Sequence, residues 1–232
     1  MLNNINKRIV NRIPVSYLIK RSYFYGLLFY VDRNVFIPRS PMVSLFYRKF
    51  LPWVKTLKVK SILDLCTGSG CLAISCCYIF SKSIIDAVDI SEKALEIAKI
   101  NCKKHRLCDR INFIRSDLWC NVPKIKYDLI ISNPPYVGKN QMSILPMEYR
   151  YEPKIALECI DDGFYIIKKI LVNAYKYLSK NGMLFIEVGD KYRKLINTFP
   201  KISFINVNLE LGGTGVLLFT KKDLVKIFNC KI

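Results

Sequence analysis

Short apolar runs alternate with helix-like patterns from about residue 58 onward, and this alternation constrains the fold more than any other feature of the chain. Runs with the length and composition of buried strands are SILDLC (61–66), IIDAVDI (84–90), INFIRSD (111–117), YDLIISN (127–133) and GMLFIEVG (182–189). Helical patterns over about 70–80, 91–104 and 162–178 separate several of these runs. Strands that alternate with helices form parallel sheets covered by helices on both faces. We therefore predict an α/β fold built on a mostly parallel sheet.

The two ends of the chain depart from this alternation. FINVNLE (204–210), a GGTG turn and VLLFT (216–220) indicate an antiparallel pair, which brings the predicted sheet to seven strands. Near the amino terminus, SYFYGLLFYVD (22–32) predicts a hairpin with Gly26 near its turn, and residues 42–54 predict a helix. We accordingly divide the chain into a basic N-terminal segment, residues 1–57, and a main domain, residues 58–232.

Composition excludes several classes of protein. Of the 232 residues, 51% are hydrophobic and the mean hydropathy is +0.17, values that exclude intrinsic disorder. No apolar run approaches the roughly 18 residues that a membrane span requires, and MLNNINKRIVNRIP lacks the apolar core of a secretory signal. The nine cysteines include no C-x-x-C pair, so we expect neither a disulfide scaffold nor a structural metal site. Reduced thiols in a cytoplasmic protein are the expectation.

Basic residues are concentrated near the amino terminus. The net charge of the chain is +19, and residues 1–60 hold twelve basic residues and one acidic residue, a balance of +11. Such asymmetry indicates a polyanionic partner, either a ribosome or a nucleic acid, that contacts the N-terminal segment. A genome biased toward lysine codons is an alternative explanation of the overall charge.

The first predicted strand ends in the sequence DLCTGSG, from Asp64 to Gly70. Glycine lets the backbone approach a ligand closely, and the N-terminus of the following helix offers free N–H groups, so this junction is typical of nucleotide-binding sheets. A G-x-G pattern alone is weak evidence, because a tight turn between a strand and a helix produces the same sequence.

Two acidic residues follow the next two strands. Asp89 stands nineteen residues after Gly70, where a carboxylate can accept hydrogen bonds from both hydroxyls of a ribose. The alternative is that Asp89 and Glu92 form a capping box for the next helix. Asp117 could hold the amino group of an adenine or simply begin a loop.

The most specific motif is Asn133-Pro134-Pro135-Tyr136, at the end of the fourth strand. Two prolines cannot continue a central strand, but they make a stiff loop at the carboxyl end of the sheet, where ligands of such folds bind. The side-chain carbonyl of Asn133 and the backbone carbonyl of Pro134 are two acceptors that match the two hydrogens of a planar amino group. Tyr136 can pack on that group.

Together, DxxTGSG, the strand-ending Asp89 and NPPY resemble the class I methyltransferases that methylate planar amino groups with S-adenosylmethionine. The chain is further similar to the HemK-type protein-(glutamine-N5) methyltransferases, and within them to the PrmB branch, which acts on large-subunit ribosomal protein three. The segments that carry this similarity are RIPVSYL (12–18), FYGLLFYVD (24–32), PRSP (38–41), EYRYEPKIAL (148–157), DDG (161–163), EVG (187–189) and LELGGTGVLLFT (209–220). The resemblance covers about residues 8–225 and implies a Rossmann-like fold with the N-terminal hairpin as an appendage.

The resemblance also implies the site. Asp64, Cys66, Thr67, Gly68, Ser69 and Gly70 would cradle the methionine and ribose parts of S-adenosylmethionine, Asp89 would hold the ribose, and Asp117 and Leu118 would border the adenine. Asn133, Pro134, Pro135 and Tyr136 would bind the glutamine amide, with Asn133 also facing the cofactor, and S-adenosylhomocysteine would be the product. No metal is implied.

The implied partner is a ribosomal protein, within a precursor of the large subunit, and the basic N-terminal segment could contact ribosomal RNA. Alternatives are a release-factor glutamine methyltransferase, an enzyme that methylates amino groups of RNA or DNA bases, and a ribosome assembly factor without catalysis. Relatives usually carry a helical domain before the RIP sequence, where this chain has residues 1–11, so docking of the target is the element most open to change.

Overall fold

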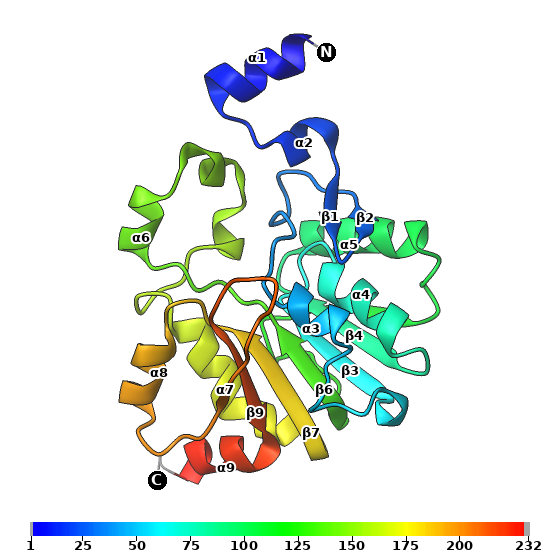
Figure 1. Cartoon of the computed structure of the whole chain (residues 1–232), viewed down its shortest axis with the longest axis vertical. Coiled ribbons are helices and arrows are strands. Elements are labelled where there is room, and N and C mark those ends of the chain that lie inside the picture. Colours follow the sequence, from blue (N-terminus) through cyan, green and yellow to red (C-terminus); the bar gives the residue numbers. More distant parts are fainter. Residues whose placement is uncertain (1, 230–232) are drawn as a thin grey trace.

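The larger sheet has seven strands in the order β5-β4-β3-β6-β7-β9-β8, and a separate two-stranded sheet joins β1 to β2. This arrangement comes from a computed structural model that describes residues 2–229 (Figure 1). The strands are β1 Ser22–Phe24, β2 Leu27–Phe29, β3 Ser61–Leu65, β4 Ile84–Asp89, β5 Ile111–Arg115, β6 Tyr127–Ser132, β7 Leu178–Glu187, β8 Ile205–Asn206 and β9 Val216–Thr220. The predicted seven-stranded sheet and the N-terminal hairpin are confirmed.

Helices connect and flank these strands. The helices are α1 Leu2–Asn11, α2 Val15–Ile19, α3 Val43–Tyr47, α4 Cys71–Ile79, α5 Glu92–Lys104, α6 Lys139–Ile144, α7 Tyr165–Tyr177, α8 Tyr192–Thr198 and α9 Lys221–Asn229, with single 3-10 turns at η1 Thr56–Lys58, η2 Met147–Tyr151 and η3 Lys154–Ala156. None of the helices within residues 2–229 combines the length and the apolar character needed to cross a membrane.

The order of the strands explains where a ligand can bind. Neighbouring strands from β5 to β7 are parallel, and β9 is antiparallel to both β7 and β8. The chain runs outward from β3 through β4 to β5 and then returns to β6, on the other side of β3. A crevice forms at the carboxyl ends of the strands where the direction of winding reverses, and in this sheet that point lies between β3 and β6.

Alternate residues of the central strands enter two different cores. Ile62, Ile85 and Phe185 pack with side chains of α3 and α4 on one face, whereas Leu63 and Leu184 pack with those of α7 and α9 on the other. Successive side chains of a strand point to opposite faces, so a central strand needs apolar residues at every position. The first core contains buried residues from both sides of the boundary predicted at residue 57, among them Phe46 and Phe50 before it and Val59 and Ile62 after it.

Three predicted elements are shorter than expected. The helix predicted over 42–54 is limited to α3, because Lys49 and Phe50 have φ values of 52° and 60° and Pro52 disfavours helix before it. The helix predicted from 162 begins at Tyr165, after left-handed residues that include Gly163. The strand predicted over 204–210 pairs only at β8.

Candidate functional site

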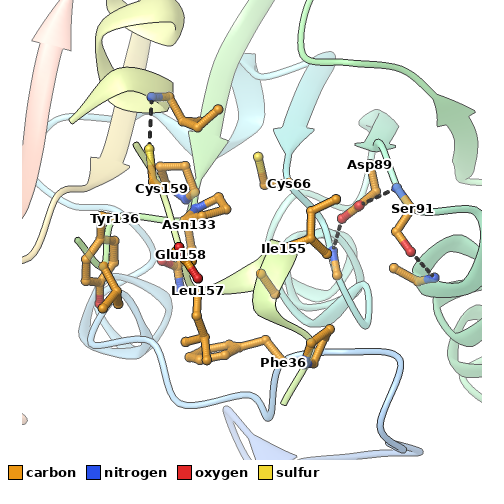
Figure 2. Close-up of a pocket in the computed structure, with 18 of the residues that line it drawn as sticks. Phe36, Cys66, Asp89, Ser91, Asn133, Tyr136, Ile155, Leu157, Glu158 and Cys159 are labelled. Atoms are coloured by element: carbon orange, nitrogen blue, oxygen red, sulfur yellow. Dashed lines mark hydrogen bonds between the residues drawn. The ribbon is translucent and has the colours of Figure 1, made fainter. Parts of the chain in front are cut away.

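A cavity of about 630 Å³ opens at the carboxyl ends of β3, β4 and β6, at the reversal of winding. In Figure 2, Asp89 and Ser91 lie on one side of Cys66, and Asn133 and Tyr136 lie on the other. The predicted residues that line the cavity are Cys66, Thr67, Gly68, Ser69, Asp89, Asp117, Leu118, Asn133, Pro134, Pro135 and Tyr136. Residues from four loops, widely separated in the sequence, therefore face one space.

Asp64 and Gly70, which were also predicted to hold the cofactor, are not among the lining residues. Asp64 is fully buried, and its Oδ2 accepts hydrogen bonds from Thr67 Oγ1 at 2.6 Å and from the backbone N–H of Ala73 at 3.1 Å. Burial raises the pKa of this carboxyl to about 7. Asp64 thus shapes the loop from beneath, because it joins Thr67 to the first turn of α4.

The loop after β3 turns through left-handed backbone. Cys66, Gly68 and Gly70 have φ values of 63°, 56° and 78°. A Cβ at Gly70 would lie 3.1 Å from the Cβ of Ala98 in α5, so the absence of a side chain permits close packing of the two helices. The second glycine of the motif is therefore required for packing, and the first lies at the cavity.

Asp89 is bonded to the glycine loop itself. Its Oδ2 accepts a hydrogen bond from the backbone N–H of Gly68 at 2.8 Å, and its Oδ1 accepts one from the N–H of Ser91 at 2.9 Å, as Figure 2 shows. The residue that caps α5 is Ser91, whose Oγ accepts from the N–H of Ala94 at 3.3 Å. Burial raises the pKa of Asp89, and the two N–H donors oppose that shift. The capping-box interpretation of Asp89 is thus replaced by a capping serine.

The loop after β5 forms a second wall of the cavity. Leu118 is buried and has a φ of 46°, and Asp117 is exposed. Ser116 holds this turn, because its hydroxyl donates to the carbonyl of Leu118 at 2.9 Å and accepts from the N–H of Asn121 at 2.8 Å. Sequence reasoning did not single out Ser116, whose only signal is its position beside Asp117.

Asn101, in α5, supports the site through hydrogen bonds. It was not singled out from the sequence. Its buried side chain donates to the carbonyl of Ser69 at 2.9 Å and to the carbonyl of Tyr30 at 3.0 Å, and it accepts from the N–H of Tyr30 at 2.7 Å. A fully buried asparagine inside a helix is unusual unless its amide is satisfied. This one joins the glycine loop to the chain that follows the N-terminal hairpin.

The NPPY tetrapeptide follows β6 directly. Ser132 anchors the end of the strand, because its hydroxyl donates to the carbonyl of Leu65 in β3 at 2.8 Å. Asn133 is half-buried, and its amide makes no hydrogen bond within the described residues; Pro134 is buried. An amide side chain and a backbone carbonyl group are therefore found on adjacent residues that line the cavity.

Tyr136 fits into space left by two glycines. A Cβ at Gly189 would lie 2.7 Å from Cε2 of the Tyr136 ring, and a Cβ at Gly163 would lie 2.0 Å from its backbone oxygen. Both glycines have positive φ values, 55° and 82°. Any larger residue at either position would displace Tyr136, so the DDG and EVG segments act on the site through close packing.

Residues 138–158 form a flap, which carries α6 and begins and ends beside the site. At its base, the N–H of Val137 donates to the carbonyl of Leu157, and the N–H of Cys159 donates to the carbonyl of Val137, both at 2.9 Å. Lys191 Nζ donates to Gln141 Oε1 at 2.8 Å and holds the first turn of α6. Figure 1 shows the flap extending away from the sheet, toward the N-terminal helices.

Two glutamates join the flap to the N-terminal segment. Glu152 is buried, pairs with Arg39 at 2.8 Å and accepts from the N–H of Ile37 at 3.1 Å. Glu148 accepts from Arg8 at 2.8 Å and from Arg12, and these arginines lower its pKa to about 2. Three arginines of the basic N-terminal segment, Arg8, Arg12 and Arg39, therefore have an acidic partner in the flap.

No group of three or more histidine, cysteine, aspartate or glutamate side chains within residues 2–229 is arranged to hold a metal ion.

The chain is similar to known methyltransferases. A family model described as "Methyltransferase small domain" matches residues 48–147. A ribosomal protein uL3 glutamine methyltransferase of Francisella tularensis subsp. tularensis is 45% identical over 227 residues, which cover 97% of this chain and 72% of the relative. A protein of the same name from Bordetella pertussis is 38% identical over 225 residues, 97% of this chain and 76% of the relative.

Among solved structures, a methyltransferase from Pyrococcus furiosus matches with a TM-score of 0.63 at 19% identity, over 94% of this chain and 98% of the other. At this identity the match bears on the fold alone, and it agrees with the mostly parallel α/β fold predicted from the strand pattern.

Proposed function

The chain belongs to the family of ribosomal protein uL3 glutamine methyltransferases, and on this premise we propose that it transfers a methyl group from S-adenosylmethionine to the side-chain amide nitrogen of a glutamine in ribosomal protein uL3. The observation that carries the proposal is the placement of the NPPY tetrapeptide across one cavity from Gly68 and Asp89. Such a cavity can hold a methyl donor and a planar amide side by side.

The lining of the cavity suits S-adenosylmethionine. Gly68 exposes backbone to the cavity because it lacks a side chain, and the neighbouring carboxylate of Asp89 can accept hydrogen bonds from ribose hydroxyls. Leu118 supplies an apolar surface for the adenine, with Asp117 beside it. Cys66, Thr67 and Ser69 complete the cradle, and Asp64 and Gly70 give it its shape. When bound, the cofactor supplies a methyl group on a positively charged sulfur.

Asn133 and Pro134 orient the acceptor. An amide nitrogen is a poor nucleophile, because its lone pair is delocalised into the carbonyl group. The Asn133 side-chain oxygen and the Pro134 backbone oxygen accept the two N–H hydrogens, and so they direct the nitrogen toward the methyl group. These oxygens also stabilise the positive charge that develops on the nitrogen. Tyr136 packs on the amide plane, Pro135 stiffens the loop, and the proton leaves to solvent.

We further propose that the N-terminal segment contacts ribosomal RNA in a precursor of the large subunit. The described structure gives Arg8 and Arg12 an ion-pair partner in Glu148, but it gives none to Lys7, Lys20 and Arg21. Unpaired cations on an exposed surface favour binding to a polyanion. A cytoplasmic location remains part of the proposal and is supported by the free cysteines of the described chain.

The test is to incubate the protein with S-adenosylmethionine labelled in its methyl group and with large-subunit precursor particles. We expect label in ribosomal protein uL3, located on a glutamine by mass spectrometry, and transfer about 100- to 1,000-fold slower with the Asn133→Ala variant. Label in RNA would instead assign the site to a nucleobase amino group, and label in neither fraction would exclude catalysis on this particle.

A further inference from the structure

Glu187 is a buried carboxylate that the proposed chemistry does not use. It is the last residue of β7, and 3% of its surface is exposed. Its Oε1 accepts a hydrogen bond from the hydroxyl of Tyr136 at 2.7 Å, and its Oε2 accepts one from the hydroxyl of Ser40 at 2.5 Å. A carboxylate is expensive to bury, so both oxygens need such partners.

The tyrosine that Glu187 holds stands between two cavities. Tyr136 lines the 630 Å³ cavity that contains Gly68 and Asp89, and it also lines a second cavity of about 570 Å³. Glu187 lines the second cavity and is not among the lining residues of the first. Tyr136, like Arg39 and Ser40, therefore lines both cavities, and its hydroxyl is bonded to a residue that lines only the second.

The other partner, Ser40, brings in the N-terminal segment. Its hydroxyl oxygen accepts from the N–H of Met42 at 3.1 Å while it donates to Glu187, so the PRSP turn and the end of β7 are joined at one atom. Pro41 of the same turn lies against Gly213, because a Cβ at Gly213 would lie 2.6 Å from the Cβ of Pro41. The turn is thus fixed against both β7 and the loop before β9.

Steric packing does not hold the hydroxyl of Tyr136. Gly189 lies against one edge of the ring, and Gly163 lies against the backbone oxygen of Tyr136. The hydrogen bond to Glu187 holds the hydroxyl end of the ring.

We propose that Glu187 is a positioning residue for methyl transfer, because its carboxylate fixes Tyr136 beside the Asn133 and Pro134 acceptors and ties it to the N-terminal segment through Ser40. This inference rests on the proposed function. A displacement of about 1 Å in a positioning group can lower a rate about 100-fold without weakening cofactor binding.

The test compares Glu187→Ala with Glu187→Gln. Glutamine keeps an oxygen for the Tyr136 hydroxyl, and its amide can donate to the Ser40 oxygen, so we expect a kcat within about tenfold of the wild type. Alanine removes both acceptors, and we expect kcat on the ribosomal substrate to fall about 100-fold with an unchanged Kd for S-adenosylmethionine. Combining Glu187→Ala with Tyr136→Phe should cost no more than the more severe single change, since both act on one contact.

The chain offers a matched control in Asp86, a second buried carboxylate that accepts from a tyrosine hydroxyl, that of Tyr127, at 2.6 Å. It lies within β4, away from the carboxyl end of the sheet. Asp86→Ala should lower the Tm and leave kcat within about threefold of the wild type. A Glu187→Ala variant that behaves like Asp86→Ala would overturn the proposal.

Hydrogen exchange gives a readout that does not depend on turnover. Glu187→Ala should speed exchange of the backbone amides in residues 136–138, and Glu187→Gln should not. If Glu187→Ala does not fold, kcat should be compared for Glu187→Gln, for Tyr136→Phe and for the variant that combines them. Losses of kcat that add in the combined variant would refute the shared contact. A wild-type protein that methylates no glutamine would overturn the proposed function. Unchanged hydrogen exchange in Glu187→Ala would overturn only the positioning role of Glu187.

Discussion

The backbone N–H of Gly68 donates a hydrogen bond to Asp89 Oδ2 at 2.8 Å, so the first two loops of the sheet are joined at the residues predicted to hold the cofactor. Asp89 reaches the loop after β3 from the end of β4, and its other oxygen is held by Ser91. The carboxylate is consequently oriented before any ligand arrives, which lowers the entropic cost of binding.

Asp89→Ala should weaken binding of S-adenosylmethionine by roughly 1.5–3 kcal/mol, the range for hydrogen bonds to a charged group. Isothermal titration calorimetry measures the change. Ser91→Ala is the matched control, because it removes the cap of α5 at a cost of about 1 kcal/mol in stability and leaves the carboxylate in place. Unchanged affinity in Asp89→Ala, with a lowered Tm, would show that the residue supports only the loop.

The raised pKa of Asp64 predicts that the stability of the protein falls as the pH rises toward neutrality. Burial raises the pKa of Asp64 from 3.8 to about 7, so the folded protein binds a proton over a pH range in which the unfolded chain has lost it. The free energy of unfolding should therefore fall as the pH rises from about 4 to 7, by up to about 1.4 kcal/mol per pH unit, and level off above that range. Burial also raises the pKa of Asp89 and Glu187, which adds to the trend.

Urea denaturation between pH 5 and pH 8 measures this trend. Asp64→Asn should flatten it, because an amide does not titrate. A wild-type midpoint that rises across this range would contradict the assignment of a raised pKa to buried carboxyl groups.

The parts of this site that could be predicted from sequence are those with local signatures. The strand ends, the glycine turn and the NPPY loop follow from patterns within a few residues, and the reversal of strand order brings Gly68 and Asn133 to one cavity. The environment of Tyr136 has no such signature. Gly163 and Glu187 lie 27 and 51 residues beyond it, and only tertiary packing brings them into contact with it.

The structure of the flap also could not be predicted from local sequence patterns. Residues 138–158 contain short helical turns without a clear period, because the contacts that order them come from elsewhere. Glu152 pairs with Arg39 across 113 positions of sequence, and Glu148 pairs with Arg8 across 140. Counting charges in residues 1–60 could not separate the arginines with internal partners from the cations without them.

The ion pairs of Glu148 should hold the flap against the N-terminal segment. Its pKa is lowered to about 2 by Arg12 and Arg8, so their stabilising effect is present above about pH 4.5 and is lost as the pH falls toward 2. At neutral pH, Glu148→Gln should increase tryptic cleavage after Lys139 and Arg150, and high salt should do the same to the wild type. Glu210→Gln, which removes a surface pair with Arg48, is the control and should leave cleavage of the flap unchanged.

Binding to precursor particles should depend steeply on salt if the N-terminal segment contacts RNA. Replacing Lys7, Lys20 and Arg21 with glutamine should weaken pelleting with the particles and make the salt dependence shallower, because fewer counterions are released. Three lysines of the main domain, Lys176, Lys180 and Lys222, give a control of equal charge. If both triple variants weakened pelleting equally, codon usage would explain the charge asymmetry.

The effect of replacing Asn133 on kcat tests the proposed mechanism most directly. The Asn133 amide makes no hydrogen bond within the described chain, so its oxygen is available to a substrate amide, and no neighbouring side chain competes for it. Asn133→Ala removes this acceptor and leaves one substrate N–H unpaired in a desolvated pocket. Loss of a transition-state contact of this kind typically costs about 2.7–4 kcal/mol, or about 100- to 1,000-fold in kcat. Cofactor affinity should remain nearly intact.

Asn133→Asp separates shape from the acceptor. The carboxylate keeps two oxygens beside the developing positive charge, so this variant should retain more activity than Asn133→Ala. Turnover on the ribosomal substrate and binding of S-adenosylmethionine should be measured on the same preparations, since a folding defect would lower both. If Asn133→Ala turned over within about threefold of the wild type, the two-acceptor mechanism would be wrong, because the carbonyl of Pro134 alone would then suffice to orient the amide.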